Sequence, residues 1–76
     1  MRIFAVDLRH LPTPSRPDYV SNIEKFAFMV TLSPDRCFLT VYCSEPARPK
    51  QFRPCPAQDI SDFDQRLIRY TDLFGI

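Results

Sequence analysis

The chain has 76 residues, of which 45% are hydrophobic, and a formal net charge of +1. This length allows one hydrophobic core, so we expect a single domain over residues 1–76. The apolar content excludes a disordered chain, the apolar run at residues 26–30 is too short for a membrane span of roughly 20 residues, and the small net charge excludes a strong general attraction to nucleic acid or anionic membranes.

The N-terminal part predicts a strand followed by a proline-rich break. Residues 2–9 alternate apolar side chains with smaller or polar ones, as a half-buried strand does. Residues 10–17 contain three prolines, which remove backbone donors and restrict the residues before them to extended conformations. After this break, Ser15 and Asp18 favour a short helical turn that ends near Asn22.

A β-hairpin is predicted next. Residues 24–32 and 37–44 both alternate in the manner of strands, and the Ser-Pro-Asp-Arg sequence at residues 33–36 is typical of a type I turn. A competing interpretation is a helix over residues 18–30, because the apolar residues there also fit helical spacing.

The expected register of this hairpin defines its two faces. A turn centred on Pro34 and Asp35 pairs residues whose numbers sum to 69, so that Val30 faces Leu39. One face of the hairpin is then wholly apolar, and we expect it to face the core.

From Asp59 onward the apolar period changes to 3.6, which predicts an amphipathic helix that ends at Gly75. Its apolar stripe consists of Ile60, Phe63, Leu67, Tyr70, Thr71 and Phe74. Together the elements predict an α+β fold, a small antiparallel sheet of about three strands in β-β-β-α order, packed on one face by the C-terminal amphipathic helix.

The residues that could carry catalysis or bind a cofactor are few. His10 is the single histidine, and Gly75 is the single glycine, which excludes a glycine-rich phosphate loop. The acids at the expected helix start serve as caps, so we expect no metal site. Because the other residues that could carry catalysis are so few, we also expect no cofactor and no enzyme activity. The three cysteines lack the spacing of a disulfide framework or a zinc site, and we expect reduced thiols in a cytoplasmic protein.

The reverse face of the expected hairpin is the best candidate for a partner-binding site. Its apolar side chains form a patch if the first strand or a loop does not cover them. Leu73, off the stripe of the expected helix, and Ile76, at its end, extend this patch. The candidate partner-binding residues are Met29, Phe38, Thr40, Tyr42 and Leu73. The alternative is that the proline-rich segments fold over this face and make it a second small core. Strand addition at a sheet edge is another docking mode.

The proline-rich segment at residues 46–56 carries three basic residues and no acid, so it is the alternative binding site, for nucleic acid. Its candidate residues are Arg48, Lys50, Phe52 and Arg53. The simpler interpretation of this segment is a solvated basic loop.

These observations favour a small protein-binding module that acts as an inhibitor or adaptor by occupying a partner's surface. Its arginine-rich and proline-rich composition suggests a bacterial or phage origin. Its small size and its lack of catalytic groups favour a regulator of a host defence or regulatory complex. The expected partner is a protein of unknown identity, with a second copy of the chain as an alternative because so short a domain leaves apolar surface exposed. Nucleic acid ranks below these partners, and no membrane is expected.

Overall fold

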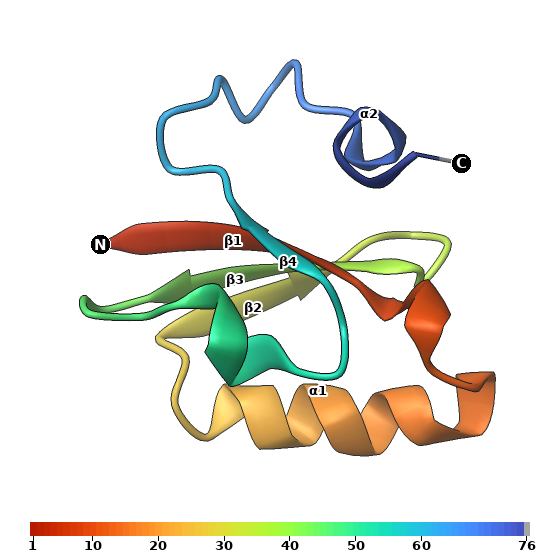
Figure 1. Ribbon diagram of the computed structural model, residues 1–76. Coiled ribbons are helices and arrows are strands. Elements are labelled where there is room, and N and C mark those ends of the chain that lie inside the picture. The colour runs from red at the N-terminus through yellow and green to blue at the C-terminus, as the bar shows by residue number, and fades with distance from the viewer. Residues whose placement is uncertain (76) are drawn as a thin grey trace.

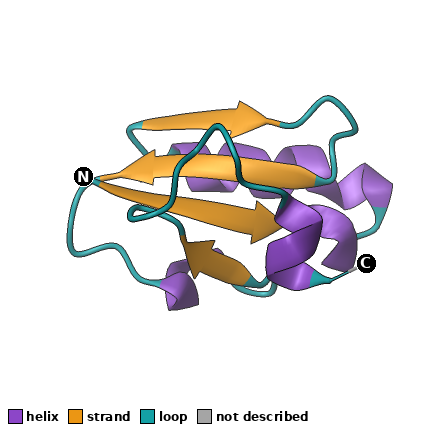
Figure 2. Cartoon of the chain, turned by 90° about the horizontal axis from the view of Figure 1, so that it is seen from above, coloured by secondary structure: helices purple, strands orange, loops and turns teal. Residues whose placement is uncertain are grey.

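A four-stranded antiparallel sheet with strand order β2-β3-β1-β4 forms the middle of the structure, a computed structural model that describes residues 1–75 (Figure 2). The strands are β1 (Arg2–Asp7), β2 (Met29–Leu32), β3 (Phe38–Cys43) and β4 (Ala57–Asp59), and the helices are α1 (Arg16–Glu24) and α2 (Tyr70–Phe74). Short 3-10 turns occupy Leu8–His10, Thr13–Ser15 and Pro49–Phe52. The predicted α+β class is confirmed. The predicted β-β-β-α order is wrong, because α1 precedes β2 and the sheet has a fourth strand.

Helix α1 covers one face of the sheet and encloses the main core (Figure 1). Pro17 lies in its first turn, where a missing N–H removes no helical hydrogen bond, and Asp18 places a negative charge at the positive end of the helix dipole. The 3-10 turn Pro49–Phe52 lies on the same face, and the Phe52 ring centroid is 5.0 Å from that of Phe4. The core comprises Phe4, Val6, Leu8, Ile23, Leu39, Val41, Cys43, Phe52 and Cys55.

The predicted hairpin and its type I turn are confirmed, but the predicted register is wrong by two residues. The Arg36 N–H donates to the Ser33 carbonyl at 2.9 Å, as in a type I turn. Arg36 then adopts a left-handed conformation with φ of 62°, and the Ser33 N–H donates to the Phe38 carbonyl at 2.9 Å. Val30 therefore faces Val41 rather than Leu39. A shift of two residues keeps every side chain on its predicted face.

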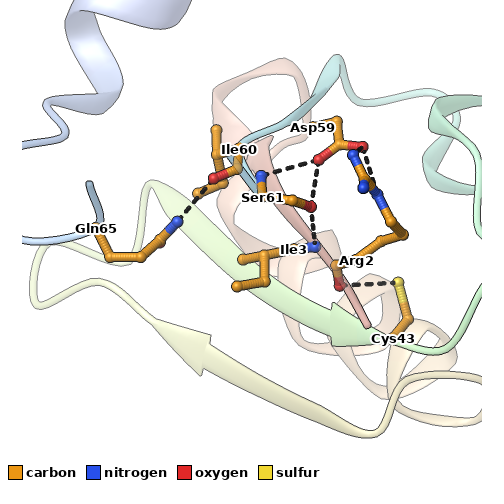
Figure 3. A network of polar contacts seen from close by, with 7 residues as sticks. All are labelled: Arg2, Ile3, Cys43, Asp59, Ile60, Ser61 and Gln65. Carbon is orange, nitrogen blue, oxygen red and sulfur yellow. Dashed lines mark hydrogen bonds and ion pairs between the residues drawn. The ribbon is translucent and has the colours of Figure 1, made fainter. Parts of the chain in front are cut away.

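The predicted C-terminal helix is much shorter than expected, because residues 57–59 pair with β1 and only Tyr70–Phe74 is α-helical. Figure 3 shows the polar contacts at the end of β4. The Asp59 carboxylate accepts hydrogen bonds from Arg2 and from the Ser61 N–H, each at 2.9 Å. The Ser61 hydroxyl also accepts a bond from the Ile3 N–H at 2.9 Å. These contacts with β1 hold residues 59–61 away from helical geometry.

The chain that follows β4 crosses the other face of the sheet and ends in α2, so the two helices lie on opposite faces (Figure 1). The Phe38 ring stacks on Tyr70, with centroids 5.1 Å apart and an interplanar angle of 14°. The Thr40 and Tyr70 hydroxyls share a hydrogen bond, and the Arg9 guanidinium lies 4.9 Å from the centroid of the Phe38 ring. This face therefore carries a second, smaller core, built by the C-terminal segment rather than by the proline-rich loop.

Candidate protein-interaction site at the edge of the sheet

The structure separates the side chains that the sequence predicts as a partner-binding patch. Phe38 and Thr40 are each 5% exposed, because α2 covers them. Met29 is 49% exposed at the edge of the sheet, and Tyr42 and Leu73 are half-buried. The predicted patch is therefore not one continuous surface, since its central residues belong to the smaller core. Ile76 lies outside the described residues.

The basic loop keeps its charges at the surface but not its aromatic ring. Arg48, Lys50 and Arg53 are exposed, on or beside the 3-10 turn Pro49–Phe52. Phe52 is completely buried against Phe4. The loop thus presents positive charge for phosphate contacts, while the ring predicted for base stacking serves the main core.

The titratable groups of the described residues are dispersed. In residues 1–75, no group of three or more His, Cys, Asp or Glu side chains is placed to hold a metal ion. The cysteines are free thiols, and burial raises the pKa of both Cys43 and Cys55. These two thiols contribute to the core as small apolar side chains and are weak nucleophiles.

Strand β2 forms one edge of the sheet, where its outer side has no partner strand in the described chain (Figure 2). Because the Ser33 N–H donates to the Phe38 carbonyl, alternation along the antiparallel ladder turns Thr31 toward β3 as well. The N–H and C=O groups of Val30 and Leu32 then point outward from the sheet. The β2 edge therefore offers two donors and two acceptors to an added strand.

A β-bulge lies at the N-terminal end of β2. The Phe28 N–H donates to the Tyr42 carbonyl at 2.8 Å, although Tyr42 already faces Met29 in the ladder. Two residues of this strand thus oppose one residue of β3. Phe28 is 73% exposed, the largest exposed fraction among the apolar side chains near β2.

The two edges of the sheet differ in their protection. Strand β4 has only three residues, follows Pro54 and Pro56, and ends in the ion-paired Asp59. Residues 26–33, which contain β2, have no charge, no proline and no glycine. Natural proteins protect free edges with short strands, charges or prolines. The β2 edge therefore lacks the charges and prolines that accompany β4.

A pocket of about 450 Å³ lies beside this edge, between α1 and the end of β2. Leu8, Val20 and Leu32 give it an apolar lining. Arg16 and Arg36 line the end near the hairpin turn, and they have no carboxylate within 4 Å in residues 1–75. The pocket is therefore apolar inside and positively charged at one end.

One feature of the sequence points to this site, although the predicted partner-binding patch is not based on it. The uncharged run at residues 26–33 is visible in the sequence, but its position at a free edge depends on the strand order. Contacts between strands distant in sequence determine that order. The pocket is hidden for the same reason, because α1, the loop before it and the hairpin all contribute to its lining.

Comparisons with models of protein families, with curated proteins and with solved structures found no match. No helix in residues 1–75 is both long enough and apolar enough to cross a membrane.

Proposed function

We propose that the chain is a small protein-binding module that docks through the free edge of β2 and acts, as an inhibitor or adaptor, by occupying its partner's surface. The observation that supports this function best is the unprotected edge itself. It combines outward backbone groups at Val30 and Leu32 with an uncharged strand and exposed apolar neighbours. Strand addition uses these features, since backbone bonds provide attraction and flanking side chains provide selectivity.

The strength of such docking depends on more than the backbone. Four added hydrogen bonds contribute about 2–6 kcal/mol in total, whereas a micromolar complex needs about 8 kcal/mol. Burial of the partly exposed Met29 and Leu32 contributes further, at up to about 2–3 kcal/mol for a side chain that is fully removed from water. Side chains beside the edge must therefore take part in binding.

The experiment uses the outward direction of the Val30 N–H. Val30→Pro removes this donor and leaves the bonds between β2 and β3, while Val30→Ala also removes the valine methyl groups from the core but keeps the donor. Each tagged variant is expressed in the cells from which the chain originates, and co-purifying proteins are quantified. We expect a stoichiometric partner with the wild type and with Val30→Ala, and its loss with Val30→Pro. Equal recovery with all three would refute docking through β2.

A nucleic-acid-binding role of the basic loop is the second candidate. It is supported by the three exposed cations Arg48, Lys50 and Arg53, with no acid in residues 46–56. Phosphate contacts make affinity fall steeply with salt. Binding to single-stranded nucleic acid that persists unchanged from low to moderate ionic strength would contradict this role.

A further inference from the structure

The pocket beside β2 lies where a strand added to that edge would project its side chains. Side chains of a strand alternate between the two faces of the sheet, so every second residue of an added strand points to the face that α1 covers. Leu32 belongs both to the free edge and to the lining of the pocket. A partner strand on β2 therefore presents at least one side chain to this apolar space.

The charges around the pocket are positive at one end and negative at the other. Arg16 is half-buried, and its guanidinium donates to the carbonyls of Leu11 and Arg36 at 3.3 Å, which orients it at the pocket end. The positive end of the α1 dipole lies at the same end of the helix. Glu24 lines the pocket two helical turns away, roughly 12 Å along the axis at 1.5 Å per residue.

We propose, building on the proposed function, that the partner segment is an extended strand with a bulky apolar residue and, two residues away, an aspartate or glutamate. The apolar side chain enters the pocket at Val20 and Leu32. The carboxylate, on the same face of the added strand at roughly 7 Å from the apolar residue, reaches Arg16 and Arg36. A bidentate pair with a guanidinium provides both attraction and register.

A second copy of the chain fits this chemistry poorly. Its own edge strand is the uncharged run at residues 26–33, so pairing β2 with β2 brings no carboxylate from that strand to the arginines. The partner strand is therefore an acidic and apolar segment of a different protein.

The test is a selection of random peptides displayed on phage against the folded full-length chain. We expect enrichment of sequences with Asp or Glu two residues from Leu, Ile, Phe or Met. A synthetic peptide of the enriched sequence is then titrated against variants. Arg16→Gln combined with Arg36→Asn should weaken binding about tenfold or more, the usual effect of losing a charge-assisted hydrogen bond. Asparagine is used at position 36 because it tolerates the positive φ.

Matched controls separate this inference from the proposed function. Arg48→Gln removes an exposed arginine that does not line the pocket and should leave the affinity unchanged. Two results would overturn the acidic preference while strand addition stands: the selected peptides lack an acid, or they bind the double arginine variant as tightly as the wild type. In both cases Val30→Pro must still abolish their binding. Failure to enrich any peptide, or binding that resists Val30→Pro, would overturn both. A dimer in analytical ultracentrifugation that Val30→Pro dissociates would assign the edge to a second copy and overturn the inference.

Discussion

Replacement of Phe38 by alanine tests whether the face opposite α1 is a core or a binding surface. The Phe38 side chain is 5% exposed and stacks on Tyr70, with Phe74 at 6.2 Å between centroids. Removing a buried phenylalanine costs about 3–5 kcal/mol. A domain of this size has a total stability of about 4–11 kcal/mol, at 0.05–0.15 kcal/mol per residue. We therefore expect Phe38→Ala to remove a large part of the stability.

The assay is urea unfolding followed by circular dichroism, with Met29→Ala as a control at an exposed position of the neighbouring strand. Met29→Ala should cost less than about 1 kcal/mol, as is usual for a surface substitution. The melting temperature of Phe38→Ala should lie roughly 12–40 °C below that of the wild type, at about 4–8 °C per kcal/mol. Similar small losses for the two variants would refute the burial of Phe38 beneath α2.

Two further predictions concern titration and reactivity. Burial disfavours the charged form of Asp59, but hydrogen bonds from Ser61 and Arg2 outweigh it and hold the pKa of Asp59 below its ordinary value of 3.8. The stability that the ionised Asp59 contributes is complete above pH 3.8 and is lost as the pH falls through the folded pKa. The free energy of unfolding, measured in a series of acidic buffers, should therefore fall less in Asp59→Asn than in the wild type. Parallel curves for the two proteins would contradict this. With a thiol reagent under native conditions, the half-buried Cys37 should react well before Cys43 and Cys55, and equal rates for all three would show that the core opens there.

Local patterns predicted the parts of the fold that depend on neighbouring residues. The alternation that begins at Arg2 gives β1, and the turn signal at residues 33–36 gives the hairpin. The register differs by two because Arg36 adopts a left-handed conformation, so Cys37 is not part of the strand. Each side chain stays on its predicted face of the sheet after this shift, because side chains along a strand alternate with a period of two.

Nonlocal contacts determine the parts that local patterns missed. The helical period from Asp59 onward is present in the sequence, yet residues 57–59 pair with β1 and the Asp59 carboxylate binds Arg2. These partners are distant in sequence, so the spacing within one segment does not reveal them. The same limit applies to the candidate site. The pattern correctly placed Phe38 on the face opposite the main core, but α2 covers that face, whereas β2 is exposed because of the strand order.

Amide hydrogen exchange of β2 tests the open edge most directly. In the free chain we expect fast exchange at Val30 and Leu32, whose N–H groups point outward, and slow exchange at Thr31, whose N–H faces β3. Addition of a bound partner strand should slow exchange at Val30 and Leu32 and leave Thr31 unchanged. Protection of all three amides in the free monomer, or no change at Val30 and Leu32 on binding, would contradict docking through β2.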